Sequence, residues 1–505
     1  MHQRNGGGGR AMVDDAFRMA INAGVQAHAG GRPDLAAAHF AHAVKIAPDH
    51  PVALFNLGIA LEDAGQGDAA LPVLEEALRR RPDHAHTLFR LGSLLVLKGG
   101  LERATALLMR LLEGQPDYPD AAFRLGNVQM ALGRYDAAAA AYRRALVLAP
   151  DAGSVTNNLA GALRRQGRAV EAARLYKRAV RLAPDFADYH KNLGACLISL
   201  GQWEEGWPHY DWRHRQAAWG WRRDIPGVPR WDGSPLAGRT ILVHFEQGLG
   251  DTLQFIRYLS VLKNQGARTL FECQPTMRDI LRGVAGIDQL VCHGEPLPQA
   301  DCHAPLMSLP GLCGSSPQSV PGAKEPYLHP DADRVAAWGR RIARDGFKVG
   351  INWQAAGDER SIPLGAFAPL AAVPGIRLFN LQQKVGLDQL QALAGPFGIT
   401  CFPDAEQDQT HGSFMDTAAI IANLDLVVSC DSAMIHLAGA MGKPAFLALP
   451  WLADWRWLTH PDRTVWYDGI RMFRCERESG WDGVLRRIAQ STIDLINLKV
   501  IPCQG

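Results

Sequence analysis

The stretch L-D-L-V-V-S-C-D-S-A-M-I-H-L-A-G-A-M-G-K-P, residues 424–444, decides the fold of the second half of this chain. Its first five residues form a short apolar run, which is typical of a buried parallel strand. The small polar residues Cys430 to Ser432 break this run. A helical pattern from Ala433 to Met441 follows, with a glycine and a proline behind it as stop signals. The stretch therefore predicts a strand, a tight turn and a helix, which is the unit of a parallel α/β sheet.

The turn of this unit is a candidate site for an anion. Backbone N–H groups at the start of a helix have no partner within the helix, and the helix dipole adds roughly half a positive charge there. The Ser432 hydroxyl, the backbone at Ala433 and the His436 side chain, one turn further along the same face, can reach the same anion. The turn therefore predicts a site for a phosphate or diphosphate. A histidine that only packs in the core is the alternative.

The residues of this turn also carry a resemblance. Asp431-Ser432-x-x-x-His436-Leu437-Ala438 resembles the D-[ST]-G-x-x-H-L-A segment of the heptosyltransferase-like glycosyltransferases of family 9. In that family the segment holds the diphosphate of a nucleotide-sugar donor, which implies donor binding by Asp431, Ser432, Ala433 and His436. Ala433 stands where the family often has glycine, and its Cβ limits how closely a donor can approach the backbone.

The composition is that of a globular protein with several domains. The 505 residues are too many for one core, and the hydrophobic share of 47% and charged share of 21% are ordinary. A net charge of +2 does not indicate a nucleic-acid partner. Nine cysteines without a C-x-x-C pair indicate free thiols in a reducing compartment, so we expect a cytoplasmic protein.

The sequence was searched for a signal peptide and for transmembrane segments. Residues 1–13 include four consecutive glycines and no apolar stretch of the kind found in signal peptides, which predicts a flexible tail. The sequence has no run of about 18 apolar residues, so we expect no transmembrane segment and at most peripheral membrane contact.

The first half of the chain repeats with a period of 34 residues. Four columns keep this period in phase: a turn glycine, a glycine within a helix, an alanine and a proline. The period and the columns resemble the tetratricopeptide repeat, a helix pair that stacks on its neighbours. We expect a superhelix of such repeats over residues 14–216. The columns are Gly31, Gly65, Gly99, Gly133, Gly167 and Gly201; Gly24, Gly58, Gly92, Gly126 and Gly194; Ala36, Ala70, Ala104, Ala138 and Ala172; and Pro48, Pro82, Pro116, Pro150 and Pro184.

Each column has a physical reason. The turn glycine adopts a left-handed conformation at little cost, and the helical glycine and alanine let paired helices approach closely. The proline closes the second helix of each repeat. No single repeat buries its own apolar face, so stacking stabilises the array and leaves a concave binding face. We expect this face to recruit a partner protein, or the protein or glycan that is the acceptor.

Six tryptophans mark the transition to the second half. We expect them to form a hydrophobic seam that covers the end of the array, and an aromatic platform for a ligand is the alternative. The turn-rich stretch P-G-V-P-R-W-D-G-S-P-L-A-G predicts a linker over residues 217–238. The six are Trp203, Trp207, Trp212, Trp219, Trp221 and Trp231.

Residues 239–340 predict a first, small Rossmann-like α/β domain. Apolar runs alternate with helical patterns, which favours an open parallel sheet. Asp331 and Asp333 spell D-x-D, a metal-binding motif of other glycosyltransferases. They follow a proline at the start of a polar helix, so we expect a helix cap and no metal site. The expected strands are 240–245, 269–273, 289–292 and 301–304.

The turn after the first of these strands reads E-Q-G-L-G-D, residues 246–251. Gly248 and Gly250 permit a tight turn and a close approach of the donor, and Asp251 stands at a helix start, where a carboxylate is a good cap. G-L-G-D resembles the first turn of the same glycosyltransferase family. There the aspartate is the general base toward the acceptor hydroxyl, which implies that role for Asp251. A purely capping Asp251, and Glu246 as the base, are the alternatives.

Residues 341–505 predict a second Rossmann-like α/β domain, which in the same family binds the donor. The carboxyl ends of parallel strands share one edge of the sheet, where ligands bind in such folds. The expected strands are 349–353, 377–381, 399–402, 424–428 and 445–449.

Loops at this edge supply further candidates. Arg360 and Ser361 follow the first strand and resemble the basic and hydroxyl residues that meet donor phosphate in the family; a solvated surface arginine is the alternative. Gln382 ends the next strand and is expected to point to the same site. Five residues after the last strand could wall the nucleotide base: Trp451, Asp454, Trp455, Arg456 and Trp457. Core packing is the alternative for Trp455 and Trp457.

These observations predict an α + α/β chain: a tetratricopeptide superhelix followed by two Rossmann-like domains in the GT-B arrangement. The resemblance implies a metal-independent glycosyltransferase without a cofactor, which takes a nucleotide-diphosphate-sugar donor as substrate. One alternative is a scaffold for protein partners that carries an inactive glycosyltransferase-like module. Another is a protein O-linked sugar transferase with the architecture of the eukaryotic repeat-bearing enzymes.

Overall fold

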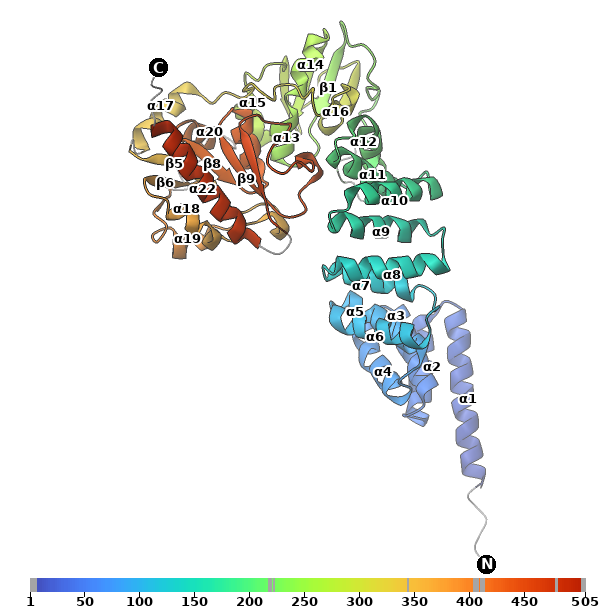
Figure 1. The fold of residues 1–505 in the computed structure, drawn as a ribbon. Helices are drawn as coiled ribbons and strands as arrows, with labels where there is room; N and C mark the ends of the chain where they lie inside the picture. The colour runs from blue at the N-terminus through green and yellow to red at the C-terminus, as the bar shows by residue number, and fades with distance from the viewer. Residues whose placement is uncertain are drawn as a thin grey trace, which may run out of the picture. The chain divides into compact units, whose positions relative to one another are not determined.

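The computed structural model describes residues 7–216, 220, 223–342, 345–402, 408, 414–476 and 480–500. The chain divides into two compact units, unit 1 with residues 1–185 and unit 2 with residues 186–505. The described part of unit 1 is helical, whereas unit 2 contains the two parallel sheets (Figure 1). The division falls before the last helix pair of the repeat array.

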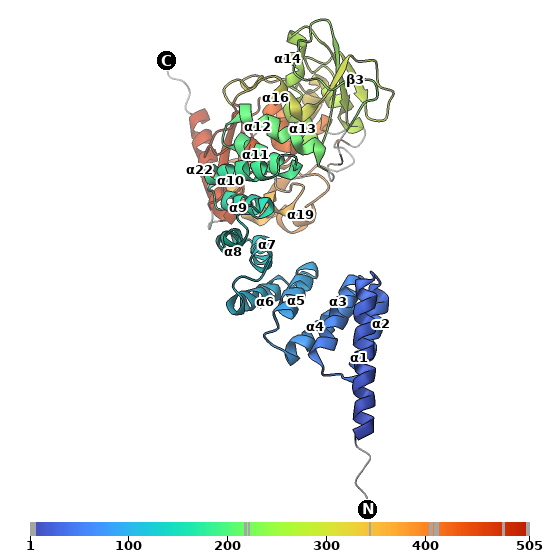
Figure 2. The same ribbon diagram turned by 90° about the vertical axis from the view of Figure 1, so that its right-hand side faces the viewer.

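The helices of unit 1 pack in consecutive pairs along the chain (Figure 2). Each pair spans one 34-residue period, so the predicted helical repeat array is confirmed. The helices are α1 (Gly7–Ala29), α2 (Pro33–Ile46), α3 (Pro51–Asp63), α4 (Gly67–Arg80), α5 (Ala85–Leu97), α6 (Leu101–Gly114), α7 (Ala121–Ala131), α8 (Tyr135–Leu148), α9 (Gly153–Arg165) and α10 (Ala169–Leu182).

Two of the glycine columns act as the sequence predicts. The turn glycines from Gly31 to Gly201 all have φ between 68° and 83°, a left-handed conformation that favours glycine. Within the helices, a Cβ on Gly126 would lie 2.4 Å from Cε1 of Tyr142 on the partner helix. The periodic glycines therefore set both the turns and the close packing of the repeats.

Helix α1 begins inside the predicted flexible tail. It starts at Gly7, and further along the helix Phe17 and Ile21 pack against α2 and α3 and anchor it. An anchored helix extends by one hydrogen bond for each added residue, even through glycine. Residues 1–6 lie outside the described residues.

Unit 2 begins with the last repeat, α11 (Ala187–Ser199) and α12 (Trp203–Tyr210), followed by the 3-10 helix η1 (Asp211–Arg215). Trp203 and Trp207 are buried in a core that they share with both sheets, and Trp203 stacks on Trp466 with ring centroids 5.0 Å apart. The predicted seam is thus confirmed for these two residues. Trp219 and Trp221 lie outside the described residues.

The first sheet has four parallel strands in the order β3-β2-β1-β4. Its strands differ from the expected bounds by at most one residue. They are β1 (Thr240–His244), β2 (Arg268–Cys273), β3 (Gln289–Cys292) and β4 (Cys302–Pro305), with helices α13 (Leu249–Phe255), α14 (Tyr258–Asn264), α15 (Arg278–Leu281) and α16 (Leu309–Leu312).

The second sheet has six parallel strands in the order β10-β9-β8-β5-β6-β7. Strand β10, at one edge, was not expected from the sequence. The predicted fold class, a repeat array followed by two parallel Rossmann-like sheets, is confirmed. The strands are β5 (Phe347–Asn352), β6 (Ile376–Asn380), β7 (Ile399–Thr400), β8 (Leu426–Ser429), β9 (Ala445–Leu449) and β10 (Ile470–Arg474).

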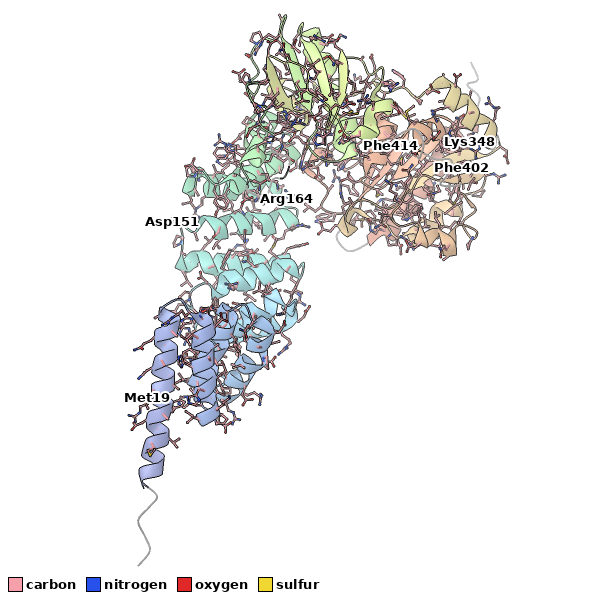
Figure 3. All side chains as sticks on the ribbon, turned by 180° about the vertical axis from the view of Figure 1, so that it is seen from behind. Met19, Asp151, Arg164, Lys348, Phe402 and Phe414 are labelled. Carbon is pink, nitrogen blue, oxygen red and sulfur yellow. The ribbon has the colours of Figure 1, made fainter. Side chains whose placement is uncertain are left out.

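Helices cover the second sheet on both faces. One face packs into the large core shared with the first sheet, and the other packs against α18 (Ala368–Ala371) and α22 (Gly480–Val500). The remaining helices are α17 (Ala332–Arg341), α19 (Asp388–Leu393), α20 (Met415–Ala422) and α21 (Ala433–Ala440). Phe402, labelled in Figure 3, packs on Trp338 of α17 at 4.9 Å between ring centroids.

The eight cysteines of the described residues are free thiols. Cys503 lies outside that part of the chain. Among the described residues, no helix is both long enough and apolar enough to span a bilayer.

Candidate functional site

The two motif turns of unit 2 meet in space. The start of α13, which carries Gly250 and Asp251, packs against the start of α21, which carries Ala433 and His436. A Cβ on Gly250 would lie 3.3 Å from the Cα of Ala433 and 3.1 Å from Cδ2 of His436. Gly250 therefore permits the close approach of the two helix starts. The two turns, which lie far apart in the sequence, therefore lie side by side in the structure.

Asp251 closes the first turn of α13. Its Oδ2 accepts a hydrogen bond from the backbone N–H of Gly248 at 3.1 Å. Asp251 lies at the third position of the helix and Gly248 at the N-cap, so the capping role is real, although the carboxylate reaches backward instead of standing at the cap itself. The other oxygen, Oδ1, is left for a second partner.

That second partner is Arg456. Its Nη2 donates to Asp251 Oδ1 at 2.6 Å, its Nη1 lies 3.0 Å from Asp454 Oδ1, and its Nε donates to Gln254 Oε1 at 3.1 Å. The Arg456 side chain is 9% exposed and that of Asp251 14%. Burial raises the pKa of Asp251 above its ordinary value, and the positive charge of Arg456 opposes this rise. Arg456 is thus the cation that most favours the charged form of Asp251, and Arg360 also contributes.

The sequence suggested Arg456 only as one of several residues that could wall a nucleotide base, and did not predict its contact with Asp251. It lies between two tryptophans in W-R-W, a pattern without a period or a motif. Asp454 caps the 3-10 helix η7 (Trp455–Trp457) by accepting from the Arg456 N–H at 3.1 Å. Arg456 and Asp251 are 205 residues apart in the sequence, so no local sequence pattern predicts their contact.

Glu246 does not belong to this cluster. Arg213 of η1 donates to its Oε2 at 2.8 Å, and the backbone N–H of Met307 donates to the same oxygen at 2.9 Å. The side chains of Glu246 and Arg213 are both 0% exposed. This geometry disfavours Glu246 as the base, because its carboxylate is buried in an ion pair with Arg213.

Ser432 and His436 are engaged inside the protein. Ser432 caps α21, since its hydroxyl accepts from the Met434 N–H at 3.2 Å and donates to Asn352 Oδ1 at 2.7 Å. His436 is 3% exposed, and its Nδ1 lies 3.0 Å from the Tyr467 hydroxyl. Burial lowers the pKa of His436 well below its usual range, which favours the neutral ring. The expected donation to a diphosphate would need the backbone at Ala433 or the other ring nitrogen.

Asp431 and Arg360 face each other beside this turn. Arg360 Nη1 lies 3.7 Å from Asp431 Oδ2, and Nη2 donates to the Ala356 carbonyl at 2.6 Å. Asp431 is 2% exposed, and its Oδ2 has no hydrogen-bond partner within the described residues. Burial raises its pKa, whereas Arg456 and Arg360 lower it. Arg360 is therefore a half-exposed cation held at the edge of the site.

Ser361 and Gln382 hold the loop that follows β5. Ser361 Oγ accepts from the Ala355 N–H at 3.2 Å, and Gln382 Oε1 accepts from the Gln354 N–H at 2.8 Å. Gln382 is 5% exposed. The expected direct contacts of these two side chains with a donor are not favoured, because their polar atoms already fix the loop that carries Arg360.

Trp455 packs in the core. Its ring lies 5.4 Å from that of Trp207 and 5.0 Å from that of Tyr210, measured between centroids. These contacts with α12 disfavour the expected role of Trp455 as a wall for a nucleotide base. Core packing, the alternative, is what the structure shows.

The D-x-D stretch is a helix cap, as expected. Asp331 accepts a hydrogen bond from the Arg334 N–H at 2.8 Å at the start of α17. Over the described residues, no three His, Cys, Asp or Glu side chains converge as they would to hold a metal ion.

Comparison with known proteins identifies the first half of the chain. Family models described as tetratricopeptide repeat match residues 27–88 and 61–117, and also residues 98–153, 123–185 and 157–206. The array therefore consists of tetratricopeptide repeats. These matches end before the first sheet.

A curated relative reaches into the second half. Protein FlbA of Caulobacter vibrioides (strain ATCC 19089 / CIP 103742 / CB 15) is 28% identical over 325 residues, covering 59% of this chain and 54% of FlbA. The chain thus spans about half the length of this relative.

Among solved structures, the chain is similar to MamA and YrrB. One crystal structure of MamA gives 23% identity and a TM-score of 0.33, covering 35% of this chain and 96% of MamA. YrrB, titled a TPR protein with an unusual peptide-binding site, gives 20% identity and a TM-score of 0.32, covering 34% of this chain and 89% of YrrB.

Proposed function

We propose that this chain is a glycosyltransferase that moves a sugar from a nucleotide-diphosphate-sugar donor to a protein or glycan acceptor recruited by the repeat array. The observation that carries the proposal is the contact between the two motif turns, in which Gly250 lies against Ala433 and His436. The turns that resemble the base-bearing and donor-binding segments of family 9 are brought together in one region. Residues 239–340 would form the acceptor side and residues 341–505 the donor side.

The chemistry assigned to this chain needs one base and one site for the leaving group. The Asp251 carboxylate takes the proton of the acceptor hydroxyl, whose oxygen then attacks the anomeric carbon. The bond from that carbon to the diphosphate oxygen breaks, and the nucleotide diphosphate leaves. The backbone N–H groups at the start of α21 and the Arg360 guanidinium stabilise the negative charge of the diphosphate.

This chemistry requires Asp251 to be a carboxylate that can reach its substrate. The Arg456 guanidinium favours the charged form, but it occupies Oδ1. The acceptor hydroxyl must therefore approach from the remaining side of the carboxylate or displace one hydrogen bond. Glu246, Ser361, Gln382 and Trp455 take no part in this mechanism.

The experiment is a donor screen on the purified full-length chain. Nucleotide-diphosphate sugars with uridine, guanosine and adenosine bases are tested for binding by calorimetry, and sugar transfer to a candidate acceptor is followed by mass spectrometry. Binding of one donor that is weakened in Arg360→Ala supports the site. The absence of binding by every donor argues against it.

A second candidate function is a scaffold whose α/β region is catalytically silent. It is favoured by the internal bonding of Ser432 and His436, whose polar atoms point to Asn352 and Tyr467. In that case the repeat array would bind partner proteins, and calorimetry would detect no binding of any donor. The same calorimetric screen separates the two functions.

A further inference from the structure

Two cysteines lie side by side at the carboxyl end of the first sheet. Cys273 is the last residue of β2 and Cys292 the last residue of β3, and the two are register partners in the parallel ladder. Both belong to the same hydrophobic core, so their side chains share one face of the sheet. Neighbouring strands are about 4.8 Å apart, which is within the range of roughly 4.4–6.8 Å between the Cα atoms of a disulfide. The pair can therefore close a disulfide with little movement of the backbone.

Arg278, the first residue of α15, contacts one of these two sulfurs. Its Nε donates a hydrogen bond of 2.8 Å to Cys292 Sγ. The ion pair of Arg278 with Glu295 uses Nη2 and leaves Nε for the sulfur, and Glu295 also accepts from the backbone N–H of Cys292 at 2.8 Å. A cation beside a cysteine sulfur stabilises the thiolate, which is the form that reacts with oxidants. Of the two cysteines, Cys292 is therefore the nucleophile.

Cys273 has the opposite environment. It is 0% exposed, and burial together with the neighbouring Cys292 thiol raises the pKa of Cys273 to about 12. Cys273 is thus a neutral thiol at neutral pH, and it is not the thiol that meets an oxidant first. Its position beside Cys292 suits it to react second, with a Cys292 that is already oxidised.

A small oxidant can reach Cys292. Strand β3 lies at the edge of the sheet, and the side chains of Arg278 and Glu295, which contact Cys292, are 36% and 47% exposed. Cys292 itself is 7% exposed. These values suit access by a molecule of the size of hydrogen peroxide and exclude docking of a second protein on the sulfur.

We propose that Cys292 and Cys273 form a reversible redox pair that a peroxide oxidises. The Cys292 thiolate attacks one peroxide oxygen, so that an S–O bond forms, the O–O bond breaks and hydroxide leaves, which leaves a sulfenic acid on Cys292. The Cys273 sulfur then attacks the Cys292 sulfur, the S–S bond forms, and the S–O bond breaks. Each departing hydroxide takes up the proton of one of the two thiols, so two thiols and one peroxide give one disulfide and two waters. A dithiol reductant restores both thiols by exchange.

The redox pair lies beside the turn that carries Asp251. Gln274, the residue after Cys273, donates from Nε2 to the Gln247 carbonyl at 3.1 Å and accepts from Thr252 Oγ1 at 3.0 Å. A disulfide at Cys273 would therefore act on the strand end that supports this turn. The redox chemistry of the pair does not depend on what the turn binds.

The test treats the full-length chain with hydrogen peroxide and then blocks the remaining thiols with N-ethylmaleimide in denaturant. Trypsin and Asp-N release residues 269–278 and 288–300, each of which contains one cysteine of the pair and no other. Mass spectrometry follows the linked peptides over time and after addition of dithiothreitol. Arg278→Gln removes the cation, and Arg282→Gln, at an exposed arginine four residues further on, is the matched control. Circular dichroism verifies the fold of each variant.

The proposal predicts a linked peptide that dithiothreitol releases and that forms equally fast in the wild type and in Arg282→Gln. It should form at least about tenfold more slowly in Arg278→Gln. Dimedone should label Cys292 as a sulfenic acid in Cys273→Ser, whereas Cys273 should stay a thiol in Cys292→Ser. The comparison of the two arginine variants decides even if a serine variant does not fold.

Three results would overturn the proposal. The first is a wild-type chain that gives no linked peptide under peroxide. The second is oxidation confined to other cysteines, such as the exposed Cys401. The third is a linked peptide that forms as fast in Arg278→Gln as in the wild type, because Arg278 would then not activate Cys292.

Discussion

Arg456 Nη2 donates a hydrogen bond of 2.6 Å to Oδ1 of Asp251, and this contact joins the motif turn at the start of α13 to η7 in the second α/β half of unit 2. Both side chains are largely buried, and Asp454 and Gln254 complete the environment of the guanidinium. The contact gives Arg456 two consequences that can be measured, one on stability and one on the charge of the proposed base.

The stability consequence follows from burial. Arg456→Gln leaves Asp251 without its cation in a low-dielectric region, which costs about 3–5 kcal/mol for a buried pair. Denaturant unfolding of the variant should show this loss. The double variant Arg456→Gln/Asp251→Asn removes both charges and should recover part of it. A single variant as stable as wild type would show that the pair contributes nothing.

The charge consequence appears in the pH dependence of transfer. A general base works only when ionised, so activity falls as the pH drops below the pKa of Asp251. Burial already raises that pKa above the ordinary aspartate value of about 3.9, and removal of Arg456 raises it further. The acid limb of the kcat profile should move to higher pH in Arg456→Gln and return toward wild type in Arg456→Lys. If the acid limb of Arg456→Gln lies at the same pH as that of the wild type, Arg456 does not influence the pKa of the base.

Gly250 and Gly248 form a matched pair for testing the contact between α13 and α21. A Cβ at Gly250 would meet Ala433 Cα at 3.3 Å, whereas at Gly248 it meets only Asp251 Oδ2 at 3.7 Å, an ordinary contact. Gly250→Ala should therefore destabilise the chain by about 1–3 kcal/mol, as overpacking does, and reduce transfer. Gly248→Ala should change both far less. The measurements are the melting temperature and the turnover of each variant. Equal effects of the two substitutions would contradict the close approach of α13 and α21 at Gly250.

Glu246 should behave as a structural residue. Glu246→Gln disrupts its buried pair with Arg213, so a loss of about 3–5 kcal/mol in unfolding free energy is expected. Turnover per folded molecule should persist, because the carboxylate does not reach the site. A variant with wild-type stability and no turnover would restore Glu246 as the base.

A fragment without the last helix pair, α11 and α12, should be better behaved in solution than a fragment that includes it. Residues 1–185 form a compact unit without the buried tryptophans of α12. This fragment should melt cooperatively and stay monodisperse. A fragment ending at Arg215 should expose Trp203 and Trp207 and self-associate in light scattering. Equal behaviour of the two fragments would mean that α12 needs no cover.

Much of this fold was predictable because its sequence signals are local or periodic. The 34-residue period fixes the phase of Gly126 against Tyr142, and the apolar run before Asp431 fixes β8 within two residues. Strand β10 was missed because I-R-M-F-R alternates over only five residues at a sheet edge, where Arg471 is exposed. Short alternating runs occur in many loops, so they rarely identify a strand.

The site was harder to predict because its bonds join residues far apart in the sequence. The turns that carry Asp251 and Ser432 were found from their glycines and their helix starts. The sequence around Glu246 does not predict its ion pair with Arg213. The sequence around Trp455 does not predict its packing against the side chains of α12. Some of the polar residues that follow the strands therefore lie at the proposed site, such as Asp251. Others, such as Gln382, only hydrogen-bond the surrounding loops.

The most direct test of the account is sugar transfer by Asp251→Asn at saturating donor, beside Glu246→Gln. Asparagine keeps the size and most of the capping ability of aspartate but cannot take a proton. We predict that Asp251→Asn folds, binds the donor and loses turnover by about 10²–10⁴-fold, while Glu246→Gln retains turnover per folded molecule. Wild-type turnover in Asp251→Asn would contradict the proposed base and the mechanism built on it.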